Sequence, residues 1–400
     1  MTHVIRRLPM LALAGVLLAP GCGTDDAGPR SVVSDSAGVE VVTYIEMPSL
    51  DDPDWRWRIE RTRSIPTASE RADERPLIYD PQAMVRLDDG TLVVSDVSEP
   101  HVIVIDAEAD SVISRFGATG SGPGEIRYAS PWPGPDGTIW VADARNTRTT
   151  RYTLDGEVLS SARWQFDARG SGIVMTSRTA IGTVAHRFWV TDFAENTLLD
   201  SLAWIDPCTG EMDNFVELPR EYEDRSGTRS FHGERTAWTA LPDGGVVVMR
   251  TYTPAIRYFS PDGELVREIR LPLTARPISE LEGRQAEDDM RSLARGRRPV
   301  PETDIGERYP ITTRLYAVDD STFAMYQGDL IRAVEDPPLP DGRTVWRLIT
   351  VSGRYAGAIH YPRRFVPRWA DDGYVLGVAR DSLDLATIEE YALAPPMPGG

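Results

Sequence analysis

Polar side chains recur just after apolar runs along this chain, and these are the residues that could do chemistry. Carboxylate, amide and guanidinium groups of this kind could hold a small polar ligand or a divalent cation. The candidates, in chain order, are Asp96, Glu99, His101, Asp143, Arg145, Asn146, Arg250, Tyr252, Gln327 and Arg380. Because they are spread along most of the chain, only a fold that brings distant segments together could make one site of them.

Residue types and spacing exclude several catalytic classes. The 43 basic residues are all arginine, so neither a Schiff-base lysine nor a P-loop lysine exists. The five histidines are not spaced as metal ligands, and neither a His-Glu-x-x-His nor a Gly-x-Ser-x-Gly motif occurs. The glycine-rich segment 117–124 lacks lysine and does not open a helix, so it is not a phosphate cradle. Binding is favoured over catalysis, and catalytic and metal-binding residues stay unassigned.

The charge of the chain restricts its partners. A formal net charge of −18 argues against nucleic acid, since phosphate neutralisation supplies most of the affinity of such complexes. No cofactor is evident, although a divalent cation held by carboxylates in a central channel stays open as an alternative. We expect an unidentified protein or small-molecule ligand as the partner, and a monomeric body.

A repeated unit indicates how the candidate residues are positioned. Each copy has an apolar strand, an Asp-Gly turn and a second strand, and two further short strands follow. The clearest copies contain the Asp-Gly pairs at 89–90, 136–137, 243–244 and 372–373. Asp-Gly supplies the positive φ that a tight hairpin needs. Four short strands repeating at roughly 45 residues are typical of a β-propeller blade.

Weaker copies bring the count to six, with units beginning near residues 80, 126, 170, 236, 311 and 365. The last unit has three visible strands, and the segments 39–45 and 55–61 are spare. One of them is expected to complete the sixth blade, because a closed ring protects its sheet edges. The sequence thus predicts an all-β fold at 38–396, a six-bladed propeller of four-stranded antiparallel blades.

One segment, 276–310, does not fit the blade pattern. Ser279 and Glu282 form a helix-capping signal, and apolar residues follow at helical spacing. We expect a short helical insertion between the fourth and fifth blades.

The first 22 residues have the features of a targeting segment. Arg6 and Arg7 precede an apolar run at 8–18, which is shorter than the roughly 20 residues that span a bilayer. Small residues then precede Cys22, so the segment resembles a bacterial lipoprotein signal, which implies cleavage and lipidation at Cys22. The alternative is a secretory signal with an incidental cysteine. Residues 23–37 are expected to be a flexible tether, and the protein to be exported and lipid-anchored in the cell envelope, on the periplasmic or surface side.

One stretch resembles a known repeat. Phe116 and Gly117 open the glycine-rich segment, and Asp143 ends the strand Ile-Trp-Val-Ala-Asp before Asn146. This layout resembles an NHL repeat, and with the signal it is similar to the six-bladed propeller lipoproteins of the NHL-repeat-like type. The segment 130–133 departs from the strand that NHL repeats usually have there.

In such a ring the Asp-Gly turns share one end, and the loops after each second strand share the other end with the connections between blades. That second end would gather the ten candidates into a ligand-binding face. A structural alternative is that Asp143 and Arg148 form a polar network within one blade. An enzymatic alternative is a metal-dependent hydrolase or lyase, similar to lactonase or amidating-lyase propellers, with residues converging from different blades.

Overall fold

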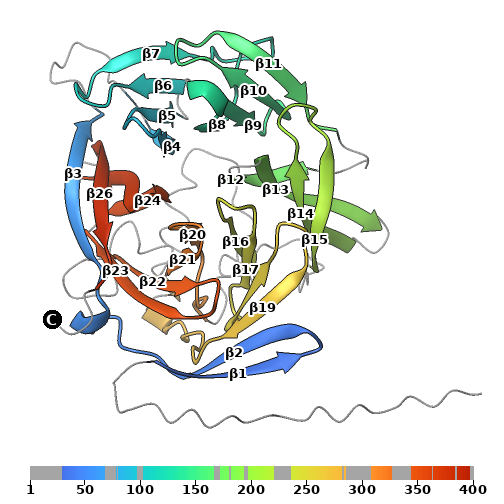
Figure 1. Cartoon of the computed structure of the whole chain (residues 1–400), viewed down its shortest axis with the longest axis vertical. Coiled ribbons are helices and arrows are strands. Elements are labelled where there is room, and N and C mark those ends of the chain that lie inside the picture. The colour runs from blue at the N-terminus through green and yellow to red at the C-terminus, as the bar shows by residue number, and fades with distance from the viewer. Residues whose placement is uncertain are drawn as a thin grey trace, which may run out of the picture.

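The computed structural model describes residues 29–67, 78, 80–96, 102–165, 172–179, 182–192, 197–219, 236–281, 283–284, 308–326, 344–362, 364–382 and 385–396. Six sheets are arranged around a central axis (Figure 1). The expected all-β, six-bladed propeller with four-stranded antiparallel blades is confirmed. Two short 3-10 turns accompany the strands, η1 (Pro53–Trp55) and η2 (Pro135–Gly137). Among the described residues no helix is long and apolar enough to cross a membrane.

Each of the first three blades is built from four consecutive strands that follow one another from the axis outward. The first blade contains β4 (Pro81–Arg86), β5 (Leu92–Asp96), β6 (Val102–Ile105) and β7 (Val112–Phe116). The second contains β8 (Ala129–Pro133), β9 (Ile139–Asp143), β10 (Arg148–Tyr152) and β11 (Val158–Arg163). The third contains β12 (Gly172–Thr179), β13 (Gly182–Asp192), β14 (Thr197–Ile205) and β15 (Met212–Pro219).

The other three blades follow the same order, with strands added from the N-terminal part of the chain. The fourth blade contains β16 (Thr236–Ala240), β17 (Val246–Arg250), β18 (Ala255–Phe259) and β19 (Leu265–Arg270). The fifth contains β20 (Leu315–Ala317), β21 (Thr322–Tyr326), β22 (Thr344–Thr350) and β23 (Tyr355–Tyr361). The sixth contains β24 (Phe365–Asp371), β25 (Tyr374–Arg380), β26 (Ala386–Ala394) and β3 (Arg58–Pro66).

The sixth blade takes its outer strand from the opposite end of the sequence. β3 pairs antiparallel with β26, with Ile65 opposite Ile388. Both side chains belong to a buried cluster that also contains Met84 of the first blade. Of the two spare segments in the sequence, the second, 55–61, therefore contributes to this strand.

The first spare segment has a different place. β1 (Arg30–Ser36) and β2 (Val39–Glu46) form a hairpin that widens the fourth sheet to six strands. β2 runs parallel to β19, with Val42 opposite Ile269. The expectation of a flexible tether as far as residue 37 is wrong for Arg30–Ser36, because the β-branched Val32 and Val33 favour a strand and β2 satisfies its backbone.

The repeated sequence signal corresponds to a repeated hydrogen-bond pattern. In the first blade the amide of Gly90 donates to the carbonyl of Leu87 at 2.9 Å, and the φ of Gly90 is +87°. In the fourth blade the amide of Gly244 donates to the carbonyl of Leu241 at 3.0 Å, with a φ of +100°. The left-handed conformation explains why glycine ends both turns.

Hydrophobic clusters hold neighbouring blades together. Each of the six interfaces between blades has its own cluster of buried side chains. Trp132, Trp140 and Trp164 of the second blade, for example, pack against Ile205 of the third. The apolar face of each blade is thus buried by the next blade, and the interface between the sixth and first blades closes the ring in the same way.

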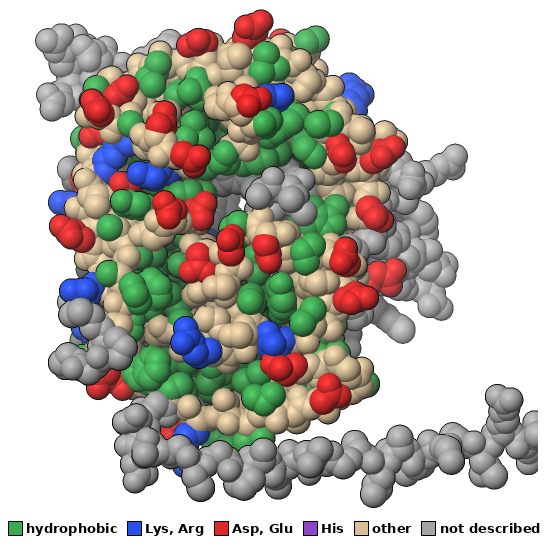
Figure 2. Space-filling view, viewed as in Figure 1, with side chains coloured by type: hydrophobic (Ala, Val, Ile, Leu, Met, Phe, Trp, Pro, Cys, Tyr) green, Lys and Arg blue, Asp and Glu red, His purple; other side chains and the backbone are tan. Residues whose placement is uncertain are grey.

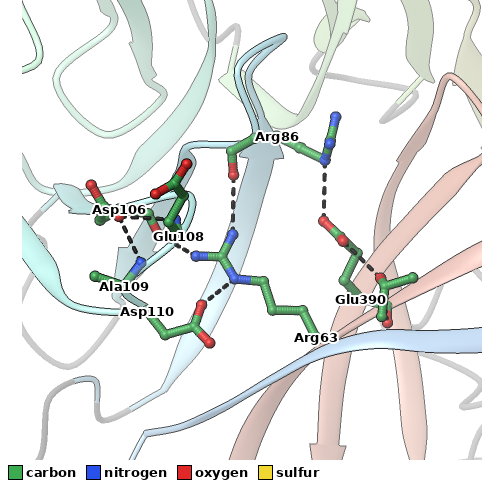
Figure 3. Close-up of polar contacts among 9 residues, drawn as sticks. Arg63, Arg86, Asp106, Glu108, Ala109, Asp110 and Glu390 are labelled. Carbon is green, nitrogen blue, oxygen red and sulfur yellow. Dashed lines mark hydrogen bonds and ion pairs between the residues drawn. The ribbon is translucent and has the colours of Figure 1, made fainter.

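Polar contacts strengthen this last interface at its rim (Figure 3). Arg63 of β3 donates to the carbonyl of Gly90 at 3.0 Å, to the carbonyl of Asp106 and to the carboxylate of Asp110. Arg86 of β4 forms an ion pair with Glu390 of β26, with 3.2 Å between Nε and Oε2. These side chains tie the sixth blade to turns of the first.

The expected helical insertion at 276–310 lies mostly outside the described residues. Its described beginning has one helical hydrogen bond, from the Gly283 amide to the Ser279 carbonyl at 2.9 Å. The amide of Tyr309 donates to the carbonyl of Arg276 at 2.7 Å, and the Arg276 guanidinium lies over the Tyr309 ring. The two ends of the segment therefore meet at the propeller body.

Candidate functional site

The two ends of the propeller channel differ in their connections. At one end, which we name the loop end, the inner strands begin and the loops after the second strands lie. At the other, the turn end, the hairpin turns lie. Figure 2 looks along the axis and shows a hollowed centre surrounded by acidic side chains.

Asp143, at the end of β9, organises the loop end of the second blade. Its carboxylate accepts hydrogen bonds from the amides of Arg127 at 2.9 Å and Tyr128 at 3.2 Å, in the connection that leads into β8. It also accepts from the amides of Arg145 and Asn146, both at 3.1 Å, and from the Asn146 side chain at 2.7 Å. This buried carboxylate thus fixes two loops at once.

Arg148 holds the glycine-rich connection in the same way. Its guanidinium donates to the carbonyls of Ser121 at 3.3 Å and Gly122 at 2.8 Å, and it contacts the Glu125 carbonyl. The Asn146 amide group donates to the Gly120 carbonyl at 2.8 Å. The contacts of Asp143, Asn146 and Arg148 are those of the structural alternative, a polar network within one blade, and the network extends to the neighbouring connection.

The first blade repeats part of this arrangement. Asp96 lies opposite Pro81 in the pairing of β5 with β4, as Asp143 lies opposite Ala129 in the pairing of β9 with β8. Its buried carboxylate accepts from the Asp80 amide at 3.2 Å. An acid at the end of the second strand therefore anchors the start of the inner strand in both blades.

A group of charged residues from three blades lies beside these anchors. Arg380, at the end of β25, donates to the carboxylate of Asp80 at 2.9 Å. Arg368 lies in the inner strand β24, at an irregularity of the pairing between Pro367 and Trp369. Its Nε atom is buried and has no hydrogen-bond partner within the described part of the chain. The buried Nε atoms of Arg56 and Arg86 also have no hydrogen-bond partner in that part of the chain, but each of these arginines has a carboxylate within 4 Å. Arg368 has no such carboxylate among the described residues, so its unsatisfied nitrogen is costly.

Arg314 precedes the inner strand β20 of the fifth blade. Its carbonyl accepts from the Thr312 hydroxyl and from the Tyr326 amide, both at 3.1 Å, so the backbone is well fixed. The side chain is exposed to solvent, yet desolvation by the surrounding protein lowers the pKa of Arg314. Because Arg314 directly precedes an inner strand, it lies at the loop end.

The pKa of Arg368 also depends on its neighbours. Burial lowers the pKa of Arg368 first, and the nearby positive charge of Arg314 lowers it further. Asp80 and Tyr128 act in the opposite direction, and Arg380 adds to the lowering. Ionisable groups of the fifth, sixth, first and second blades are thus close enough to act on one side chain, although Tyr128 is neutral at ordinary pH. We name Arg314, Arg368, Arg380, Asp80 and Tyr128 the mouth cluster.

The turn end carries the opposite charge. Asp371 ends β24 and Asp372 lies in the turn that follows it, and Asp319 and Asp320 lie in the turn that follows β20. Burial raises the pKa of Asp371, and the charges of these three neighbours raise it further. The channel therefore has arginines toward its loop end and carboxylates at its turn end.

The remaining predicted residues do not all meet in one place. Tyr252 donates to the Arg308 carbonyl at 2.8 Å, and so holds the long connection after the fourth blade. The Arg250 carbonyl accepts from the Thr253 amide at 3.1 Å, and the Arg145 side chain is exposed. Of the predicted residues that the structure describes, only Arg380 belongs to the mouth cluster. Cys22, Glu99, His101 and Gln327 lie outside the described residues.

Sequence reasoning missed Arg314, Arg368, Asp80 and Tyr128. An arginine inside the apolar inner strand at 365–371 was the available signal, because a charged side chain there must find water or a ligand. No local motif marks the other three, since they precede inner strands of different blades.

Side chains of the metal-binding types are scattered over the described residues. Within that part of the chain no three His, Cys, Asp or Glu side chains come together as a ligand set. Cys208 is a free, exposed thiol in the turn between β14 and β15.

Comparison with known proteins adds the fold alone. No protein-family model and no curated protein matches the chain. The structure of a DUF4221 family member from Bacteroides vulgatus is 12% identical, with 86% of this chain and 99% of that chain covered and a TM-score of 0.51. A candidate exported protein from Bacteroides fragilis is 10% identical, with coverage of 89% and 100% and a TM-score of 0.47. Virginiamycin B lyase from Staphylococcus aureus is 10% identical, with coverage of 84% and 100% and a TM-score of 0.42.

Proposed function

We propose that this protein is an extracytoplasmic binding module, held to a membrane through a lipid on Cys22, that binds a small polar ligand at the loop end of its channel. The observation that carries the binding role is Arg368, whose buried Nε has no hydrogen-bond partner among the described residues. A ligand that accepts from this nitrogen would remove the cost of leaving it unsatisfied. The module is of the NHL-repeat-like type, as the glycine-rich connection and Asp143 indicate.

The location rests on the N-terminal sequence. Arg6 and Arg7, the apolar run at 8–18 and Cys22 together fit export and lipidation. Acyl chains contribute about 0.8 kcal/mol per buried methylene, so two or three chains give stable anchoring. Metabolic labelling with a fatty acid tests this: wild type is labelled and sediments with membranes, whereas Cys22→Ser is unlabelled. Equal labelling of the two proteins would contradict the anchor.

The binding role is tested by blocking the channel mouth. Tyr128 is 41% exposed and belongs to the mouth cluster, so a Tyr128→Cys, Cys208→Ser protein can be labelled there with a bulky maleimide. Thermal-shift screening with a chemically diverse set of small polar molecules then compares labelled and unlabelled protein. The label is expected to abolish stabilisation by the ligands that wild type binds.

A matched control is provided by the chain itself. Wild type labelled on the exposed Cys208 carries the same bulk at a turn of the third blade, and it is expected to bind as unlabelled protein does. Ligands that bind equally well when residue 128 is labelled would show that the loop end of the channel is not the site.

A further inference from the structure

Several arginines described on this acidic protein form ion pairs with carboxylates, and Arg380 of the mouth cluster is one of them. Arg267 pairs with Glu40 at 2.6 Å and Arg61 pairs with Glu389 at 2.9 Å, both on outer strands. Arg314 and Arg368 have no carboxylate within ion-pair distance among the described residues, and the positive charge of Arg314 is close enough to lower the pKa of Arg368. Two positive charges thus lie near each other without a described carboxylate partner.

The charge balance around Arg368 is uneven. Among the described residues, the charged groups acting on it are the guanidinium groups of Arg314 and Arg380 and one carboxylate, that of Asp80. Asp80 is already hydrogen-bonded to Arg380 at 2.9 Å. Three guanidinium groups and one carboxylate leave two positive charges uncompensated within this set. Desolvated like charges are unfavourable, so an incoming anion would relieve their repulsion as well as form new bonds.

From the buried Nε of Arg368 that has no partner among the described residues, and from the engagement of Asp80 by Arg380, we infer that the ligand of the channel mouth is a dianion, a phosphate ester or a dicarboxylate, held between Arg314 and Arg368. The inference rests on the proposed function and names its ligand class. Guanidinium groups bind both kinds of anion through paired, charge-assisted hydrogen bonds. Tyr128, another member of the mouth cluster, carries a hydroxyl, a group that can donate a hydrogen bond to an anion.

The carboxylates at the turn end determine from which end of the channel an anion reaches the arginines. Asp319, Asp320, Asp371 and Asp372 surround the inner strands of the fifth and sixth blades there, and their charges repel an anion. A dianion therefore enters and leaves through the loop end. Positive charge at the loop end and negative charge at the turn end also favour a position of the dianion beside the arginines.

The inference is tested with defined probes on the full-length protein. Isothermal titration at low ionic strength compares inorganic phosphate and succinate with the monoanion acetate and the cation choline. We expect phosphate or succinate to bind more tightly than acetate, and choline not to bind. Arg368→Gln and Arg314→Gln should each weaken that binding about tenfold, as loss of a charge-assisted hydrogen bond implies. Arg58→Gln, which removes an exposed arginine from β3, should leave it unchanged.

A variant with the opposite expected effect on binding keeps the test decisive if an arginine variant folds poorly. Asp80→Asn preserves the size of the side chain and removes the only carboxylate of the mouth cluster, so it should tighten binding of the dianion. Binding of phosphate alone would assign the phosphate-ester class, and binding of succinate alone the dicarboxylate class. Affinities equal to that of acetate, or unchanged by all three variants, would overturn the inference.

Failure of the inference and failure of the proposed function give different results. If the label on residue 128 abolishes binding of a neutral or cationic ligand, while Arg368→Gln leaves that binding intact, the mouth is a binding site but not for a dianion. If the label affects no ligand at all, the proposed site itself is wrong.

Discussion

Arg380 donates a hydrogen bond to Asp80 at 2.9 Å although 300 positions separate them, and this pair joins the last blade to the start of the first. The side chains of Arg380 and Asp80 are 31% and 36% exposed. Water and salt reach both groups, so the pair adds little to stability. Its larger consequence is positional, because it keeps the one carboxylate of the mouth cluster near Arg368.

Replacing Arg380 by glutamine should therefore change the free energy of unfolding by less than about 1 kcal/mol. Hydrophobic contacts such as that of Ile65 with Ile388 and Met84 hold the two blades together without the ion pair. Urea unfolding followed by tryptophan fluorescence measures the change. A loss of several kcal/mol would show that the ion pair, and not the apolar interface, closes the ring.

Asp143→Asn should destabilise the protein far more, by about 2–3 kcal/mol, because both oxygens of this buried carboxylate accept N–H donors. An amide group would turn one acceptor into a donor that faces other donors. Arg145→Ala, which removes an exposed side chain from the same loop, should cost little. Hydrogen exchange locates the effect: faster exchange in 117–128 is expected for Asp143→Asn alone. Unchanged exchange there would contradict the anchoring role.

The parts of the fold that sequence predicts well are those with local causes. The Asp-Gly turns ending at Gly90 and Gly244 were recognisable because a positive φ is a property of a few consecutive residues. Which of β2 and β3 closes the ring could not be recognised from the sequence, since both segments are rich in strand-forming residues. Pairing with β26 or with β19 depends on which edge each segment reaches in three dimensions.

The candidate site shows the same limit. Asp96 and Asp143 were noticed because each ends a clear strand, but their carboxylates are occupied by backbone amides. Arg368 and Arg314 became candidates only when the inner strands of neighbouring blades were placed side by side. The spacing of polar residues finds strand ends, whereas a channel mouth depends on which strand starts converge.

Gly357→Ala should loosen the N-terminal segment from the fifth blade. A Cβ at this position would lie 2.3 Å from the carbonyl oxygen of Trp55, and the φ of Gly357 is +123°. The same segment is held by Trp57, whose indole donates to the Ala356 carbonyl at 2.7 Å. We expect a loss of more than about 2 kcal/mol, above the roughly 1–2 kcal/mol that left-handed backbone strain alone costs.

The control for this change is Gly137→Ala. Gly137 also has a positive φ, +69°, but a Cβ there would have nothing within 4 Å. It should therefore show the backbone strain without the steric clash. Limited proteolysis within 47–57 should accelerate in Gly357→Ala and not in Gly137→Ala. Equal behaviour of the two variants would mean that the close approach of Trp55 contributes nothing.

Tyr44 should make the protein sensitive to alkaline pH. Its hydroxyl, on β2, donates to the Gly353 carbonyl at 2.6 Å, and burial raises the pKa of Tyr44 from 10.0 to about 12. Because the folded state binds this proton more tightly than the unfolded state, stability is complete below pH 10 and falls progressively between pH 10 and 12. Tyr44→Phe lacks both the hydrogen bond and the proton, so it should be about 1 kcal/mol less stable at neutral pH. It should also lose less stability than wild type as the pH rises through that range. Urea unfolding at a series of pH values measures both proteins, and parallel curves above pH 10 would show that the Tyr44 hydroxyl is already ionised or already exposed in the folded state.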